Sequence, residues 1–270
     1  MSHPDSPFLV QPGTRAVLSD LDPHAKYGLE KKEGKAEIKE LSKELNDLQE
    51  LLYATRKYAL LIVLQGMDTS GKDGVIKHVV EAFNPQGVCV TGFKVPTEEE
   101  LDHDFLWRVH KATPRKGIVG VFNRSHYEDV LVVRVANLAP EAVWRRRYEA
   151  INAFERTLAE SGTIVLKFYL HISKERQQER LQDRLDDPTE HWKFKAGDLD
   201  VRAQWDAYTA AYQDALSFCS TPYAPWYIIP ADRKWVRNLL ISRILRDTLS
   251  SLDMTWPPLE EEARGIDIIT

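Results

Sequence analysis

Short runs of apolar residues alternate with helically spaced apolar positions along most of this chain. The first run, YALLIVLQ at 58–65, is nearly continuous, which is typical of a strand buried on both faces of a sheet. Strands of this kind separated by helices form βαβ units, so the pattern predicts an α/β fold with a five-stranded parallel sheet. The other four predicted strands are 88–93, 117–123, 163–172 and 226–231.

The segments between these runs carry apolar residues three and four positions apart, the spacing of an amphipathic helix. In 29–54 this stripe is aliphatic, with charged residues on the other side of the helix. In 140–161 and 198–219 the stripe is rich in aromatic residues, which we interpret as core. A last helix is predicted at about 234–250.

The first residues of the chain differ from the rest. Residues 1–28 show no periodicity and are rich in Pro, Asp and Ser, so we expect an extended N-terminal arm. No repeat, low-complexity tract or interdomain linker interrupts 29–270. We therefore predict one domain over 29–270.

Composition and charge narrow the function classes. The chain has 270 residues and a formal net charge of -5, from 36 Lys and Arg residues against 41 Asp and Glu residues, which makes nucleic acid a poor candidate partner. The N-terminus lacks a signal-peptide pattern, and no apolar stretch approaches the roughly 20 residues that span a bilayer. We therefore expect a cytoplasmic protein that has no membrane partner. Cys89 and Cys219 lie among apolar residues and are predicted to be buried free thiols.

A glycine-rich segment follows the first predicted strand. Residues 66–74 read GMDTSGKDG, which fits G-x-x-x-x-G-K, the core of a Walker A loop, and a helical pattern comes next. Glycines let such a loop curl so that successive N–H groups point at phosphate oxygens, while the lysine and the helix start add positive charge. The alternative is a glycine-rich turn without a ligand. The predicted phosphate-binding residues of the loop are Gly66, Thr69, Ser70, Gly71, Lys72, Asp73 and Gly74.

Two carboxylates set this loop apart from the usual motif. Asp73 occupies the position where a Ser or Thr hydroxyl normally binds Mg²⁺, and Asp68 lies inside the loop. Two negative charges beside a phosphate cradle would repel phosphates unless a metal lies between them, so we expect Mg²⁺ or Mn²⁺ as an obligatory cofactor. For Asp68 the alternative is a turn-forming residue without a ligand role.

The third predicted strand also leads into polar residues. Arg124 is placed to grip a phosphate through two nitrogens, and Glu128 and Asp129 are candidates for binding metal or orienting an acceptor. The alternative for the two acids is capping of the next helix. His126 lies nearby without an obvious partner. The predicted catalytic residues are Asp68, Lys72, Arg124, Glu128 and Asp129, and the predicted metal ligands are Asp68, Asp73 and Asp129.

A basic helix follows the fourth predicted strand. Arg176, Arg180 and Arg184 are four residues apart, so they share one helix face. We predict that the segment at about 175–197 is a lid that closes over phosphates, with Arg180 and Arg184 as phosphate-binding residues. The alternative is a solvated helix whose arginines pair with neighbouring glutamates, and for Arg176 the two interpretations are equally supported.

Together these segments resemble the family-2 polyphosphate kinases. The resemblance covers about 30–250 and is carried by GMDTSGKDG, FNRSHYEDV at 122–130, ERLQDRLDDPTEHWKF at 179–194 and STPYAPWYIIPA at 220–231. It implies a three-layer α/β/α P-loop kinase fold of the thymidylate-kinase type with a helical lid. It also implies reversible, Mg²⁺-dependent transfer of a phosphoryl group between inorganic polyphosphate and a nucleotide.

The resemblance further implies roles for single residues. Asp68 and Asp129 resemble the acids that organise Mg²⁺ and the acceptor phosphate. Lys72 and Arg124 resemble the phosphate grips. The lid arginines correspond to Arg180 and Arg184.

The acceptor is implied by three positions. Many members have Asp at the position of Asn123 and Asn-Arg in place of Glu128-Asp129, and those members mainly phosphorylate the diphosphate. The pattern in this chain resembles class III, which accepts both AMP and ADP and forms ADP and ATP. We therefore predict a polyphosphate:AMP/ADP phosphotransferase.

Two other functions stay open from the sequence. One is an ATP-dependent nucleoside or nucleotide kinase of the same fold, against which Asp68 and Asp73 argue because they change the usual arrangement of nucleotide and Mg²⁺. The other is a non-catalytic nucleotide sensor. Formation of ADP from AMP and polyphosphate without added ATP would separate these functions. The amphipathic helix at 29–54 and the aromatic residues are compatible with a homo-oligomer.

Overall fold

The structure is a computed structural model, and it describes residues 6–263. Its sheet has five strands in the order β2-β3-β1-β4-β5, each parallel to its neighbours. This confirms the predicted α/β class and the five-stranded parallel sheet. The strands are β1 (Ala59–Gln65), β2 (Val88–Gly92), β3 (Val119–Asn123), β4 (Thr163–His171) and β5 (Trp226–Pro230).

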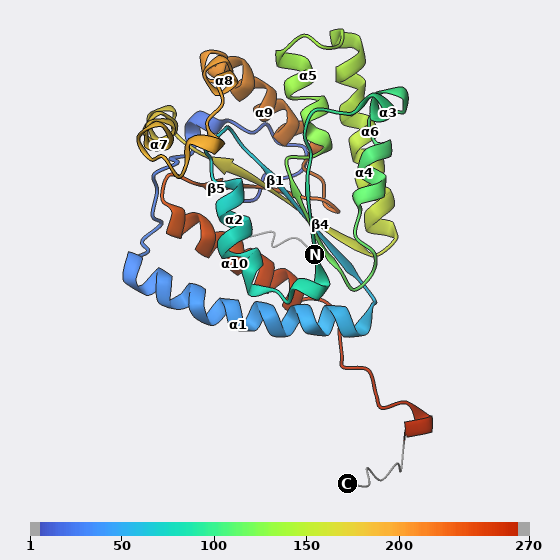
Figure 1. The fold of residues 1–270 in the computed structure, drawn as a ribbon. Helices are drawn as coiled ribbons and strands as arrows, with labels where there is room; N and C mark the ends of the chain where they lie inside the picture. The colour runs from blue at the N-terminus through green and yellow to red at the C-terminus, as the bar shows by residue number, and fades with distance from the viewer. Residues whose placement is uncertain (1–5, 264–270) are drawn as a thin grey trace.

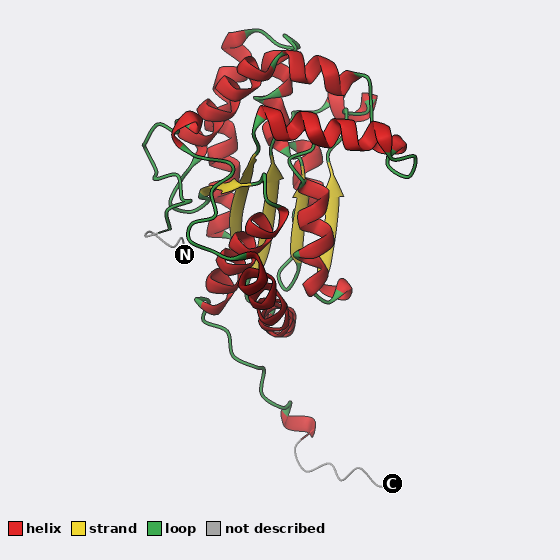
Figure 2. Ribbon diagram, turned by 90° about the vertical axis from the view of Figure 1, so that its left-hand side faces the viewer, coloured by secondary structure: helices red, strands yellow, loops and turns green. Residues whose placement is uncertain are grey.

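Helices cover both faces of the sheet, so the fold has three layers (Figures 1 and 2). On one face lie α1 (Lys31–Thr55), α2 (Lys72–His78) and α10 (Lys234–Ser250). On the other face lie α4 (Trp107–Ala112), α5 (Val132–Val135), α6 (Glu141–Glu160) and α9 (Trp205–Cys219). The remaining α-helices are α3 (Glu98–Asp102), α7 (Lys174–Asp186) and α8 (Gly197–Ala203).

The central strand β1 shows why its sequence is almost continuously apolar. Leu61 and Val63 pack into the core under α6 and α9, whereas Leu60, Ile62 and Leu64 pack into the core under α1 and α10. Successive side chains of a strand point to opposite faces, and here both faces are covered. The glycine-rich loop therefore starts from a strand that is packed on both faces.

The N-terminal segment packs along the outer edge of the sheet. Ile228 of β5 donates to Phe8 O at 2.8 Å, and the N–H of Val10 donates to Trp226 O at 2.9 Å. Val10 and Leu18 are buried in the same core as α6 and α9. The segment thus covers the backbone edge of β5, which would otherwise be open to pairing with another chain.

Two predictions about the fold were wrong. The predicted helix 198–219 is divided into α8 and α9, because the chain turns at Gln204 between them. Cys89 is exposed, not buried, because β2 is an edge strand and three of its five residues are exposed. Cys219 is a buried free thiol, as predicted.

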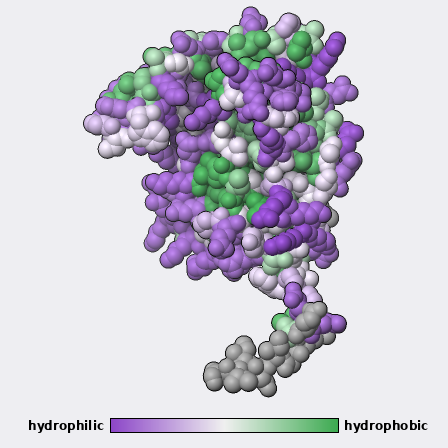
Figure 3. Space-filling view, turned by 45° about the vertical axis from the view of Figure 1, so that its right-hand side comes forward, coloured by the Kyte–Doolittle hydropathy of each residue, from purple (hydrophilic) through white to green (hydrophobic). Residues whose placement is uncertain are grey.

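Hydrophilic side chains cover most of the face shown in Figure 3, with smaller apolar areas between them. Within residues 6–263, none of the helices combines the length and the apolar character needed to cross a membrane. After α10 the chain extends away from the body (Figure 1).

Candidate active site

The glycine-rich loop curls around its own lysine. Gly66 and Gly71 have φ values of 147° and 101°, which favour glycine, and Thr69 is also left-handed at 64°. Lys72 is buried, and its Nζ donates to Gly66 O at 2.8 Å and to Met67 O at 3.3 Å. Burial lowers the pKa of Lys72, and the nearby Arg124 lowers it further. The start of the loop therefore closes around the ammonium group of Lys72.

The end of β3 lies directly beside this loop, because β1 and β3 are neighbours in register. Arg124 Nη2 donates to Asp68 Oδ1 at 2.9 Å, and Arg124 Nη1 lies 3.6 Å from Glu128 Oε2. Asn123 Nδ2 donates to Asp73 Oδ1 at 2.7 Å. The structure thus brings together Asp68, Lys72, Arg124 and Glu128, with Asp73 at the margin.

Glu128 and Asp129 are adjacent in sequence but face different cations. Both lie in a short 3₁₀ helix, η4 (His126–Asp129), after β3. Burial raises the pKa of Glu128, although Arg124 and Lys72 oppose this. Asp129 faces Arg147 of α6 instead, with Nη1 to Oδ1 at 2.8 Å. Burial raises the pKa of Asp129 to about 6, against the opposing charges of Arg147 and Arg108.

The three aspartates predicted as metal ligands each have their own partner. Asp68 pairs with Arg124, Asp73 with Asn123 and Asp129 with Arg147. Within residues 6–263, no three His, Cys, Asp or Glu side chains are grouped as a metal site requires. Mg²⁺ in kinases is commonly held by one or two carboxylates together with substrate phosphates and water. Asp68 and Asp73, which both lie near Lys72, fit that arrangement, whereas Asp129 faces Arg147 of α6.

The predicted lid arginines are engaged with the protein itself. Arg180 is buried, and its guanidinium donates to Thr69 O at 2.7 Å, Ala231 O at 2.8 Å and Asp232 O at 2.9 Å. Arg184 donates to Lys193 O at 3.3 Å and lies 3.6 Å from Asp198 of α8. Arg180 therefore ties α7 to the glycine-rich loop in this structure.

Two tyrosines of α9 border the same cluster. Tyr208 and Tyr212 are buried, and the pKa of each is raised by burial and next by the charge of Glu128. We had assigned this aromatic stripe to the core, and both residues do belong to it. Their second role at the site has no signal in the sequence, because helical spacing alone shows only that a face is covered.

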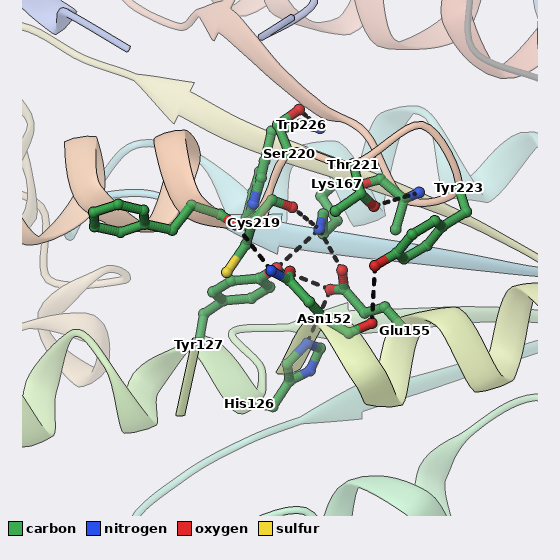
Figure 4. Close-up of polar contacts among 12 residues, drawn as sticks. His126, Tyr127, Asn152, Glu155, Lys167, Cys219, Ser220, Thr221, Tyr223 and Trp226 are labelled. Carbon is green, nitrogen blue, oxygen red and sulfur yellow. Dashed lines mark hydrogen bonds and ion pairs between the residues drawn. The ribbon is translucent and has the colours of Figure 1, made fainter. Parts of the chain in front are cut away.

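A buried polar network supports η4 from behind (Figure 4). Lys167 of β4 donates to Glu155 Oε2 at 2.5 Å, to Tyr127 Oη at 2.8 Å and to Cys219 O at 2.6 Å. Glu155 Oε1 also accepts from Tyr127 Oη at 2.9 Å, and His126 Nε2 lies 3.1 Å from the same oxygen.

The interpretation of His126 as a residue without a partner was therefore wrong, because Glu155 pairs with it. The signal that could have revealed the network is Lys167, a lysine in the middle of an apolar strand. Such a charge is tolerated only with a buried partner. The network fixes the 3₁₀ helix that carries Glu128 and Asp129.

Comparisons with known proteins point to one family. Residues 28–256 match the sequence model of the family described as Polyphosphate kinase 2 (PPK2). An AMP/ADP-polyphosphate phosphotransferase from Meiothermus ruber is 51% identical over 263 residues, which cover 97% of this chain and 98% of that protein. An ADP-polyphosphate phosphotransferase from Rhodopseudomonas palustris is 46% identical over 79% of this chain and 78% of that protein.

Solved structures give the same picture. Polyphosphate Kinase 2 from Arthrobacter aurescens TC1 superimposes with a TM-score of 0.89 at 46% identity, covering 92% of this chain and 90% of that chain. A putative polyphosphate kinase 2 from Pseudomonas aeruginosa PA01 gives a TM-score of 0.82 at 33% identity, over 87% of this chain and 50% of that chain. The predicted P-loop kinase fold is thereby confirmed.

Proposed function

Because this chain belongs to the polyphosphate kinase 2 family, we propose that it transfers phosphoryl groups reversibly between inorganic polyphosphate and both AMP and ADP. Membership of the family makes the chain a phosphotransferase that acts on nucleotides and polyphosphate. The observation that carries the proposal is the cluster of Lys72, Arg124, Asp68 and Glu128 where β1 and β3 end. The cluster combines a phosphate-binding loop with carboxylates, which would repel a phosphate that has no metal ion bound.

The residues divide by charge. The backbone of 66–74, Lys72 and Arg124 bind phosphate oxygens, and the two cations oppose charge that develops on the transferred group. Asp68 and Asp73 would hold Mg²⁺ or Mn²⁺, which neutralises phosphate charge when bound. Gln177 donates to Asp68 O at 3.2 Å, so α7 supports the position of this aspartate from the lid side.

The acceptor is assigned to the corner formed by Glu128 and Asp129. An enzyme that serves both AMP and ADP must bring either terminal phosphate to one point of attack, although the two acceptors differ in length by one phosphate. Carboxylates can position a short acceptor through a metal ion, whereas an Asn-Arg pair would grip a longer acceptor directly. The relative with 51% identity is named for both acceptors, which supports AMP and ADP as the acceptors of this chain.

The predicted lid completes the site. In our proposal Arg184 and the later residues of the predicted lid 175–197 approach the phosphates when substrate binds, while Arg180 acts from its position against the loop. A cytoplasmic location and a homo-oligomer stay predictions, and light scattering coupled to gel filtration tests the latter.

The proposal is tested by supplying AMP, polyphosphate and Mg²⁺ without ATP. Nucleotide chromatography measures the products, and we expect ADP to appear first and ATP afterwards. An ATP-dependent kinase of the same fold would form no product under these conditions. If AMP and ADP both stay unchanged with polyphosphate while ATP supports phosphorylation of AMP, the polyphosphate assignment is wrong.

A further inference from the structure

Arg237 lies under the glycine-rich loop. It belongs to the first turn of α10 and is 1% exposed. Its Nη1 donates to Ser70 O at 3.4 Å, and its Nε and Nη2 donate to Asn238 Oδ1 at 3.0 and 2.8 Å. The loop is therefore supported from the side that faces α10 by a guanidinium group.

Two glycines of the loop are needed to admit this side chain. A Cβ atom at Gly71 would lie 1.7 Å from Arg237 Nη1, and a Cβ atom at Gly74 would lie 2.7 Å from Arg237 Nη2. Both distances are below 3.0 Å, closer than Cβ atoms in proteins come to other non-bonded heavy atoms. The glycines of this motif thus serve the contact with Arg237 as well as the curl of the loop.

Arg237 and Arg180 hold successive carbonyl groups of the loop, Ser70 O and Thr69 O. In a trans peptide the C=O and N–H groups point to opposite sides. The bond to Ser70 O therefore turns the N–H of Gly71 away from Arg237. The two arginines fix which side of the loop presents N–H groups.

Within residues 6–263, neither guanidinium forms an ion pair, although the charges of Asp232, Asp183 and Glu179 act on Arg180 from farther away. In the part of the chain that the structure describes, no carboxylate lies within 4.0 Å of the guanidinium of Arg180 or Arg237. Burial lowers the pKa of Arg237 to about 9, and the charge of Arg180 adds to this. A buried charge without a partner is costly, so the arrangement is expected to be favoured by an anion that binds on the other side of the loop.

We propose that Arg237 is a positioning residue for the phosphate donor: with Arg180 it orients the peptide groups of the loop, and it places behind them a positive charge that has no carboxylate partner. This inference rests on the proposed phosphate site. It assigns Arg237 to the inorganic phosphate chain and not to the nucleoside. A group of this kind acts through the loop, since Arg237 itself is buried away from solvent.

The test measures binding of inorganic tripolyphosphate with Mg²⁺, in the absence of nucleotide, by calorimetry. Arg237→Met removes the charge at similar length, Arg237→Lys keeps the charge without the fork, and Arg243→Met is the matched control. Arg243 lies on the same helix but pairs with Glu37 at 2.6 Å. We expect affinity to fall about 10-fold or more in Arg237→Met, to recover in part in Arg237→Lys, and to stay unchanged in the control.

Two further measurements separate this role from a purely structural one. The unfolding temperature without ligand should change little in Arg237→Met, because removal of an unpaired buried charge offsets the loss of the hydrogen bonds to Ser70 O and Asn238 Oδ1. The affinity ratio between wild type and variant should persist at high salt, because buried charges are screened much less than exposed ones.

A lower unfolding temperature with wild-type affinity in Arg237→Met, or in Arg237→Lys if the Met variant does not fold, would show a structural role only. Absence of tripolyphosphate binding in the wild type would instead overturn the proposed function, and this inference with it.

Discussion

Arg147 of α6 donates to both the carboxylate and the main-chain carbonyl of Asp129, at 2.8 and 3.1 Å. This double contact holds the last residue of η4 against the neighbouring helix. Its guanidinium also lies 4.9 Å from the ring of Phe105, so Arg147 is itself fixed. The orientation of Asp129 is therefore set by the protein before any acceptor binds.

The first prediction is an acidic limb in the pH profile. Burial raises the pKa of Asp129 to about 6, so the carboxylate that we assign to the acceptor is lost as the pH falls through this value. We expect transfer rates to drop in that range. Asp129→Asn should lose most transfer at pH 7 and show no acidic limb near pH 6. Initial rates between pH 5 and pH 8 at saturating substrate measure this.

Stability provides the control for that profile. The folded-state pKa of about 6 lies above the roughly 3.9 of an unfolded aspartate, so the folded protein binds more protons between these values. The contribution of Asp129 to the free energy of unfolding is therefore greatest at low pH and falls as the pH rises through this interval. Unfolding at pH 5.5 that runs parallel to the loss of activity would contradict the assignment.

The second prediction concerns Glu128. Its side chain lies near Arg124 and Lys72, whereas Asp129 lies near Arg147, so the two acids are not interchangeable. Glu128→Asn should change the ratio of the AMP and ADP rates more than it lowers the better of the two. Separate initial rates with each acceptor measure the ratio. An unchanged ratio would show that this corner does not select the acceptor.

The third prediction concerns Lys72. We expect Lys72→Met to lower turnover by about 10²-fold or more, because it removes a charge that opposes the developing negative charge. Since Nζ also holds Gly66 O and Met67 O, a modest loss of stability should accompany this change. Lys77→Met, at an exposed position of the same helix, is the control and should be neutral. Near-normal turnover in Lys72→Met would remove the loop from the mechanism.

The sequence predicted the strands and the loop because both are local patterns. A buried parallel strand reads as an apolar run, and the loop after it needs glycines at fixed spacing. The contacts of Arg180 and Arg237 could not be predicted, because their partners are backbone carbonyls 111 and 167 residues away. Every residue has a backbone carbonyl group, so these partners leave no signal in the sequence. An arginine that binds a loop carbonyl therefore cannot be distinguished by sequence from one that binds a phosphate.

The exposure of Cys89 has a similar cause. Periodicity indicates a strand but not its place in the sheet. The strand order β2-β3-β1-β4-β5 puts β2 at an edge, and this order cannot be read from the periodicity. The prediction for Asp68, Asp73 and Asp129 also assumed that acids near the strand ends converge. The three acids have different partners instead: Asp68 pairs with Arg124, Asp73 with the adjacent Asn123, and Asp129 with Arg147 of α6.

The fourth prediction divides the lid into a fixed and a responsive part. Gln177 and Arg180 tie the first half of α7 to the loop, whereas 187–197 is held by local contacts such as Thr189 to Asp187 and Lys193 to Glu190. Adding polyphosphate and nucleotide should slow amide exchange in 187–197 more than in 174–181. Hydrogen exchange with mass spectrometry measures this. Exchange in 187–197 that is unaffected by both ligands would count against a lid.

The last prediction concerns the buried pair of Glu155 and Lys167, both 0% exposed. Burial opposes ionisation of Glu155, but Lys167 and His126 lower its pKa, so the pair is charged inside the core. Lys167→Met should destabilise the protein by about 3–5 kcal/mol, because it leaves a carboxylate without its cation. The double variant Glu155→Leu, Lys167→Met removes both charges, so it should be more stable than Lys167→Met alone. Urea unfolding of the wild type, both single variants and the double variant gives the coupling free energy.

Additive losses would mean that the pair is not coupled. Partial recovery of stability without recovery of transfer would show that the network also sets the position of η4, on which Glu128 and Asp129 depend.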